Sequence, residues 1–216
     1  MIETEKPDLT IIAWDLLNKS NIWYAEYFKD FKQKYDSLIF AVMWNHDVMS
    51  NIEAIKKVED ISGITFLNNE PIIFLDWVTI RDWCNVMNYA ETCTWTIQIV
   101  WLIDKSLWGN KTLEQNLKDA KIDTLNENNF NILVTHQPIS LDKLKDYPID
   151  LEVAWHTHRG QFYWMRKVIE WLNDYAYWEY RLWNKIAFVT QWIWAWGLPF
   201  RLWTQSEMVI INLIKK

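Results

Sequence analysis

The sequence predicts an α/β fold in which mixed β-sheets lie between helical layers. Several apolar runs are continuous rather than alternating, as in strands that are covered on both faces. Amphipathic helical patterns fall between the early runs, and this alternation is typical of α/β proteins. At 216 residues the chain has the length of one domain with a sizeable core. We therefore predict a single domain over residues 1–216.

The elements follow one another in a regular order. The runs with strand composition are Leu9–Ala13, Ser37–Met43, Ile72–Leu75, Thr96–Ile103, Asn131–Thr135, Leu151–Ala154, Lys185–Thr190 and Met208–Leu213. The helical patterns are Asn21–Lys34, Ser50–Ile61 and Thr112–Leu125. The later part holds more strand and loop, with an aromatic stretch at Tyr175–Tyr180. Met1–Pro7 has the pattern of a helix end that leads directly into the first strand, so we expect an N-terminally incomplete domain.

Composition excludes some classes of function. The net charge of −6 argues against binding to a nucleic-acid duplex, which requires a basic face. Phosphorylated small molecules stay compatible with it, because bound metal ions supply positive charge locally. Cys84 and Cys93 lack metal-type spacing. There is no run long enough for a membrane span and no signal-peptide pattern, so the chain as given is expected to be soluble, with its compartment open.

Tryptophan is abundant where glycine is scarce. The chain has 17 Trp and 4 Gly, whereas average usage near 7% predicts about 15 Gly. Five Trp stand at strand-to-loop corners where glycine is the usual residue; they are Trp14, Trp44, Trp155, Trp192 and Trp194. We predict that many Trp are glycines in the native protein, as in genetic codes that read UGA as glycine, whereas Trp196 is retained. The alternative is a truly Trp-rich protein with aromatic binding surfaces.

Polar residues that can bind metals follow four of the strands. These residues are Asp15, Asn45-His46-Asp47, His136, and the pair His156 and His158, so all four His of the chain lie at strand ends. In open α/β sheets, ligands bind beyond the carboxyl ends of the strands. Each residue alone could serve a turn, a helix cap or the core. Together they predict a metal site, and carboxylate, amide and imidazole ligands suit Zn, Mn or Fe rather than Ca.

With glycine in place of Trp, these corners read Gly-Asp, Gly-Asn-His-Asp, His-Gln-Pro and Gly-His-Thr-His-Arg-Gly-Gln. This ordered set resembles the calcineurin-like metallophosphoesterases, over nearly the whole chain from Lys6 onward. Residues 190–201 would read Thr-Gln-Gly-Ile-Gly-Ala-Trp-Gly-Leu-Pro-Phe-Arg, which is similar to a segment of the bacterial branch of that family. The resemblance implies a four-layer α/β/β/α sandwich that lacks its first strand, with two divalent metal ions.

The resemblance also implies roles for single residues. Asp15 would bridge the two ions, Asn45, His136 and His156 would bind the second ion, and His158 would bind the first. His46 would stabilise the phosphoryl oxygens or protonate the leaving group, and Asp47 would fix its ring. The Asp-x-His motif that opens the family pattern has no counterpart upstream of Lys6. Arg159 stands where glycine is common in the family.

The function implied is metal-dependent hydrolysis of a phosphomonoester or phosphodiester by a metal-activated bridging hydroxide. The substrate would be a phosphorylated small molecule or a phospholipid-type molecule, selected by loops around Asp76–Asn88 and Phe162–Tyr180. Relatives of this branch are often tethered to a membrane by an upstream helix, which leaves membrane association of a longer form open. Two alternatives remain, an inactive fragment or pseudoenzyme that keeps the fold, and a Trp-rich binding module without enzymatic activity.

Overall fold

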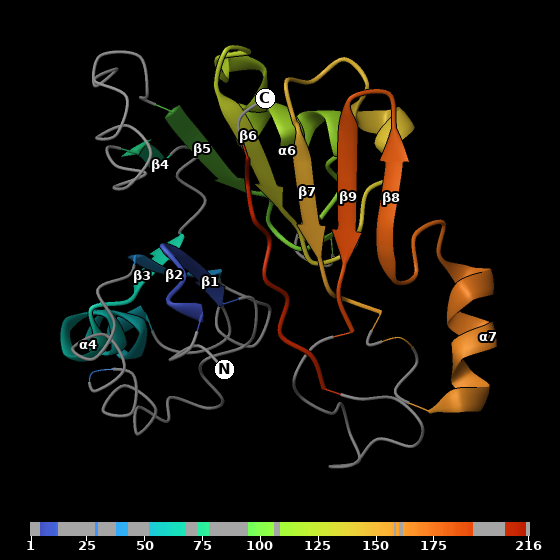
Figure 1. Cartoon of the computed structure of the whole chain (residues 1–216), viewed down its shortest axis with the longest axis horizontal. Helices are drawn as coiled ribbons and strands as arrows, with labels where there is room; N and C mark the ends of the chain where they lie inside the picture. Colours follow the sequence, from blue (N-terminus) through green and yellow to red (C-terminus); the bar gives the residue numbers. More distant parts are fainter. Residues whose placement is uncertain are drawn as a thin grey trace. The chain divides into compact units, whose positions relative to one another are not determined.

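The computed structural model describes residues 5–12, 29, 38–42, 52–67, 73–77, 95–105, 109–157, 159, 162–191 and 206–214. The chain divides into two compact units (Figure 1). The first comprises Met1–Glu70, Ile103–Gly109 and Val209–Lys216, and the second comprises Pro71–Leu102 and Asn110–Met208. Each unit has its own sheet, and each is described separately.

The first unit is built on a parallel sheet of three strands in the order β1-β2-β3. The strands are β1 (Leu9–Ile12), β2 (Leu38–Val42) and β3 (Thr65–Leu67), and helix α4 (Ile52–Ser62) lies between β2 and β3 in the chain. Ala54, Ile55 and Val58 form the buried face of α4. The helix predicted over Ser50–Ile61 is thereby confirmed.

The second unit is built on a mixed six-stranded sheet in the order β4-β5-β6-β7-β9-β8. The four central strands β5 (Trp95–Trp101), β6 (Phe130–Val134), β7 (Leu151–Ala154) and β9 (Lys185–Val189) are parallel. The edge strands β4 (Ile73–Trp77) and β8 (Trp178–Leu182) pair in the antiparallel sense. Parallel strands place all their carboxyl ends at one edge of a sheet, which is visible as the common arrow direction of β6, β7 and β9 in Figure 1.

Helix α6 (Leu113–Asp119) connects β5 to β6 and is shorter than predicted. It begins with a capping box, because Thr112 Oγ1 accepts from Gln115 N and Gln115 Oε1 accepts from Thr112 N. The sequence predicted a helix as far as Leu125. Instead Lys121 has a φ of 50°, which stops the α-helix before the short 3₁₀ helix η2 (Ile122–Thr124).

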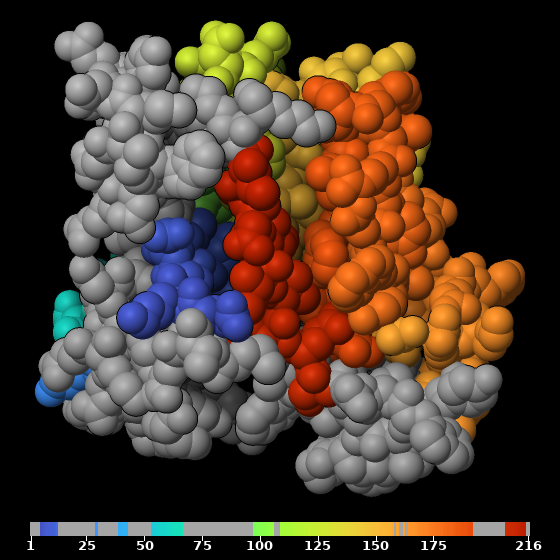
Figure 2. Space-filling view, in the orientation of Figure 1, coloured from blue at the N-terminus to red at the C-terminus, as the bar shows by residue number. Residues whose placement is uncertain are grey.

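Several predictions about the later part of the chain are wrong. The strand predicted over Met208–Leu213 does not form, because residues 206–214 pair with no described strand and expose Met208, Ile210 and Ile211 (red in Figure 2). The loop expected at Phe162–Tyr180 holds helix α7 (Tyr163–Leu172) and the start of β8. A second 3₁₀ helix, η3 (Leu141–Leu144), lies between β6 and β7. Of the predicted helix Asn21–Lys34, all but Lys29 lies outside the described residues.

Two tryptophans have the backbone conformation that favours glycine. Trp178 has a φ of 76° and Trp183 a φ of 55°, and Trp183 begins the turn between β8 and β9. A side chain in this left-handed region costs roughly 1–2 kcal/mol. Trp155 differs from them, because it lacks a positive φ and is fully buried. Of the five Trp singled out from the sequence, the other four lie outside the described residues.

The α/β class predicted from the sequence is confirmed, with parallel sheets that are flanked by helices. Among the described residues, there is no helix with the length and apolar character that crossing a bilayer requires.

Candidate metal centre

Two of the predicted metal ligands meet at the carboxyl edge of the six-stranded sheet. His136 follows β6 and His156 follows β7, and these two strands are parallel neighbours. Beyond the last strand pair, the N–H of His156 donates to the carbonyl oxygen of His136 at 3.0 Å. The rings meet as well, with 2.8 Å between His156 Nδ1 and His136 Nε2. The chain thus brings together two imidazoles from residues twenty positions apart.

The two facing nitrogens fit a shared divalent ion. Metal–nitrogen bonds of about 2.0–2.1 Å place two imidazole nitrogens on one ion about 2.8–3.4 Å apart, for bond angles from square to tetrahedral. The observed separation of 2.8 Å lies at the lower end of this range. In this hydrogen bond one ring nitrogen is the N–H donor and the other is the acceptor, so at least one ring is neutral. Neutral imidazole is the form that binds metals.

A buried glutamate holds the loop that carries His136. Glu152, in the middle of β7, is fully buried, and its Oε1 accepts from Thr135 Oγ1 at 2.8 Å and from Ile139 N at 2.7 Å. Thr135 and Ile139 lie on either side of His136, so this carboxyl group ties down both ends of the loop. Burial raises the pKa of Glu152 to about 8, against which the two hydrogen bonds act.

Sequence reasoning missed Glu152, although a signal was present. A glutamate stands in the otherwise apolar strand Leu151–Ala154. Because an unpaired charge is costly in such a position, the residue needed either partners or a proton.

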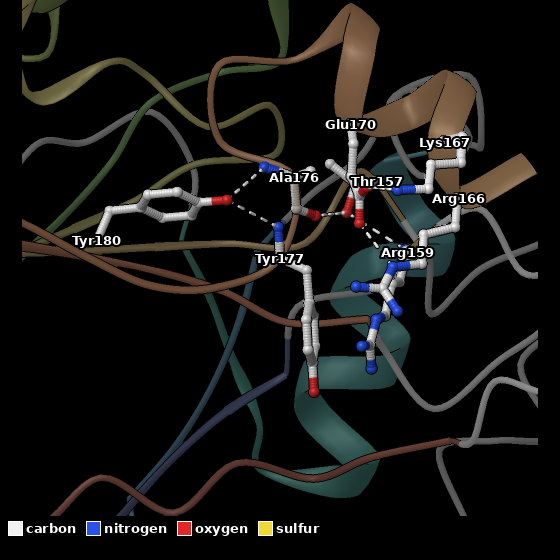
Figure 3. A network of polar contacts seen from close by, with 8 residues as sticks. All are labelled: Thr157, Arg159, Arg166, Lys167, Glu170, Ala176, Tyr177 and Tyr180. Carbon is white, nitrogen blue, oxygen red and sulfur yellow. Dashed lines mark hydrogen bonds and ion pairs between the residues drawn. The ribbon is translucent and has the colours of Figure 1, made fainter.

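The loop after β7 is tied to the turn before β8 (Figure 3). The buried Thr157 donates its hydroxyl to the carbonyl oxygen of Ala176. The Tyr180 hydroxyl accepts from the N–H groups of Ala176 at 3.0 Å and Tyr177 at 3.4 Å. The His156-Thr157 segment is therefore held on one side by the β6 loop and on the other by the β8 turn.

The remaining predicted site residues are not placed. Asp15, Asn45, His46, Asp47 and His158 lie outside the described residues. Within the part of the chain that is described, His, Cys, Asp and Glu form no group of three or more that could hold a metal ion. Of the predicted ligands, the structure therefore brings together His136 and His156.

Comparison with known proteins gives two similar proteins over nearly the whole chain. An uncharacterized metallophosphoesterase of Helicobacter pylori is 25% identical over 222 aligned residues, which cover 100% of this chain and 53% of that protein. The uncharacterized metallophosphoesterase Cj0846 of Campylobacter jejuni is 25% identical and covers 98% of this chain and 52% of its own length. The chain thus spans about half the length of these curated relatives.

A second Helicobacter pylori strain has an uncharacterized metallophosphoesterase that is 30% identical over 87 residues, or 39% of this chain. There is no match to a protein-family model. Solved structures give no match either. The mixed α/β architecture, with parallel sheets flanked by helices, is consistent with a metallophosphoesterase fold.

Proposed function

We propose that this protein is a metal-dependent phosphoesterase that hydrolyses a phosphomonoester or a phosphodiester. The observation that carries the proposal is the pair of imidazoles, His136 and His156, facing each other at the carboxyl edge of a parallel sheet. That edge is where α/β proteins bind ligands. The similarity to two proteins named metallophosphoesterases supports the same chemistry.

His136 and His156 would bind the same divalent ion of a two-ion centre. Asp15, Asn45 and His158 would complete that centre, with Mn, Fe or Zn as the metal. When bound, two such ions supply a water nucleophile of lowered pKa and offset the charge of the phosphoryl group. His46 would stabilise the phosphoryl oxygens or protonate the leaving group, and Asp47 would fix its ring. The substrate would be a phosphorylated small molecule or a phospholipid-type molecule.

The alternative of a Trp-rich binding module is not favoured. It predicts tryptophans gathered on one exposed face. In the described residues, Trp101 and Trp155 are buried, whereas the exposed Trp164 and Trp171 belong to α7, and Trp178 and Trp183 lie at the two ends of β8. Tryptophan therefore occurs in several unrelated environments.

The test uses purified protein that has been stripped of metal and reloaded with Mn²⁺, Fe²⁺ or Zn²⁺. Hydrolysis of 4-nitrophenyl phosphate and bis(4-nitrophenyl) phosphate is measured for the natural chain and for His136→Ala and His156→Ala. We expect activity that depends on added metal and is lost in both variants. Metal-dependent hydrolysis that survives both substitutions would exclude this pair as the metal site.

We also infer that glycine occupies positions 178 and 183 in the native protein. The positive φ at both positions supports this inference, because glycine adopts that conformation without steric cost. Mass spectrometry of the protein purified from its own source tests it. A peptide containing Gly at 183 is expected, and a peptide with Trp at both positions would overturn the inference.

A further inference from the structure

Arg159 follows the candidate metal centre in the chain and forms no salt bridge with the residues that the structure describes. It lies three residues after His156, and its guanidinium carbon is 4.0 Å from the centroid of the Tyr177 ring. With the residues that the structure describes, the guanidinium group makes no hydrogen bond and no ion pair. The neighbouring Glu170 is engaged by Arg166, whose Nε lies 2.6 Å from its Oε1 (Figure 3). Arg159 therefore stacks on Tyr177, and among the described residues no acceptor engages its guanidinium donors.

The backbone at Arg159 is strained. Its φ is 50°, a conformation that costs a residue with a side chain roughly 1–2 kcal/mol and costs glycine nothing. Backbone strain of this kind persists where the surroundings enforce it, and it is concentrated at functional sites. A glycine would satisfy the turn better, so the presence of arginine points to a role for its side chain.

Tyr177, on which Arg159 stacks, is fixed to the carboxyl edge of the sheet. The Tyr177 hydroxyl donates to Glu207 Oε2 at 2.9 Å. Glu207 Oε1 in turn accepts from Thr190 Oγ1 and from Gln191 N, each at 2.7 Å. Thr190 directly follows β9 and donates its N–H to the Ala154 carbonyl at the end of β7. This chain of contacts keeps the Tyr177 ring and Arg159 at the same edge as the two imidazoles.

The local charge favours anions. Among the described residues, Arg159, Arg166 and Lys167 lie near the carboxylate of Glu170, while Glu207 adds a second carboxylate at the Tyr177 hydroxyl, in a chain whose net charge is −6. The three cations lower the pKa of Glu170, with the hydrogen bond from Arg166 as the largest cause. An excess of positive charge at this edge attracts negatively charged ligands.

We propose that Arg159 determines specificity by binding a second anionic group of the substrate, separate from the phosphoryl group that is hydrolysed. The preferred substrates are thus phosphoesters that carry a further phosphate or carboxylate. The planar guanidinium offers two parallel donors to either group. This inference rests on the proposed phosphoesterase function, which it deepens by naming the substrate class.

The test compares three substrates that share one leaving-group ring. They are phenyl phosphate, 4-carboxyphenyl phosphate and 1,4-phenylene bisphosphate, and phosphate release is measured for the metal-loaded natural protein and for Arg159→Gly. In the variant we expect kcat/KM for the two substrates with a second anion to fall by about 10- to 100-fold, as for loss of a charged hydrogen bond. For phenyl phosphate the change should be less than about threefold. Whichever of the two anions shows the larger loss identifies the group that Arg159 binds.

Two controls separate recognition from folding. Arg159→Gly relieves the positive φ, so its melting temperature is expected to equal or exceed that of the natural protein. Arg181→Gln removes an arginine from β8 that pairs with Glu179 and is not among the charges that shift the pKa of Tyr177, so it should leave all three substrates unchanged. Arg159→Lys keeps the charge without the planar fork and should lose part of the preference.

Calorimetric titration of 1,4-phenylene bisphosphate and phenyl phosphate provides a readout that is independent of turnover. The natural protein should bind the bisphosphate more tightly, and Arg159→Gly should remove that preference. Should the natural protein hydrolyse none of the substrates, the phosphoesterase proposal fails, and the titration still decides the role of Arg159. Equal losses for all three substrates, or a bisphosphate preference that survives Arg159→Gly, would overturn the inference.

Discussion

The two ends of the central strands in the six-stranded sheet both carry polar groups, but these groups are satisfied in different ways. At the amino ends, the buried Lys185 Nζ donates to the carbonyl oxygens of Tyr147 at 2.6 Å and Ile149 at 2.9 Å. Asp150 Oδ2 accepts from Asn131 N at 2.8 Å. Here the charged side chains are hydrogen-bonded to backbone groups.

At the carboxyl ends, ionisable side chains also face one another, although Glu207 accepts from the backbone N–H of Gln191 as well. His136 and His156 meet through ring nitrogens, and Arg159 stacks on Tyr177. An imidazole or guanidinium group that meets another side chain can contact a ligand without leaving a backbone group unpaired, whereas Lys185 and Asp150 cannot. We therefore expect the amino end to contribute to stability and the carboxyl end to carry the proposed ligand site.

The largest expected effect follows from breaking the imidazole pair. His156→Ala removes one of two nitrogens on the proposed ion, so we expect metal affinity to fall by at least about 100-fold, since loss of outer-shell partners alone costs 10- to 100-fold. Phosphoesterase activity should be lost with it. Competition titration with a metal indicator measures the affinity, and a variant that binds metal as the natural chain does would remove His156 from the site.

Glu152 tests the same comparison, because its buried carboxyl group holds the loop at the carboxyl end of β6. Glu152→Leu leaves the Thr135 hydroxyl and the Ile139 N–H buried without their acceptor, at a cost of about 1–3 kcal/mol each. Glu152→Gln is the matched control, because its amide oxygen can accept both bonds. Chemical denaturation should show a large loss of unfolding free energy for Leu and a small one for Gln. Similar losses in both variants would show that the two hydrogen bonds accepted by Glu152 do not account for its contribution to stability.

The same residue predicts how stability depends on pH. The pKa of Glu152 is raised from 4.5 to about 8 in the folded chain, so between these values the folded state binds one proton more than the unfolded state. Its contribution to the free energy of unfolding therefore falls as pH rises from about 5 to 8, by at most about 1.4 kcal/mol per pH unit, and is constant above that range. Denaturation at several pH values checks this slope. Glu152→Gln should remove it.

Lys185→Met removes the hydrogen bonds that Lys185 makes at the amino ends of the strands. Loss of two hydrogen bonds from a buried ammonium group is expected to cost about 1.5–3 kcal/mol of unfolding free energy. Metal affinity and kcat/KM of the folded protein should stay unchanged, since the proposed site lies at the opposite edge. A decrease in metal affinity equal to that of His156→Ala would show that the two ends do not have separate roles.

The sequence predicted the features that follow from local patterns and from strand order. It did not predict features that depend on other contacts between distant residues. The central strands and the convergence of His136 with His156 were predictable, because continuous apolar runs fix parallel strands and parallel strands share one carboxyl edge. Helix α7 was missed because Trp and Tyr at helical spacing also suit strands and loops. Met208–Leu213 has strand composition, yet pairing requires a free neighbouring edge that no local pattern reveals. Arg159 and Tyr177 meet through a turn whose geometry the sequence does not encode locally.

The smallest expected effect concerns Trp183, whose backbone conformation favours glycine. At position 183, where φ is 55°, Gly should be more stable than Ala by about 1 kcal/mol. At Trp164, which is also exposed but lies in helix α7, Ala should be more stable than Gly by about the same amount. Thermal denaturation of the four variants measures both differences, and side-chain losses largely cancel within each pair. A reversal of sign between the two positions is expected, because backbone conformation alone distinguishes glycine from alanine there. If Ala is preferred at both positions, residue 183 does not adopt the left-handed conformation in solution.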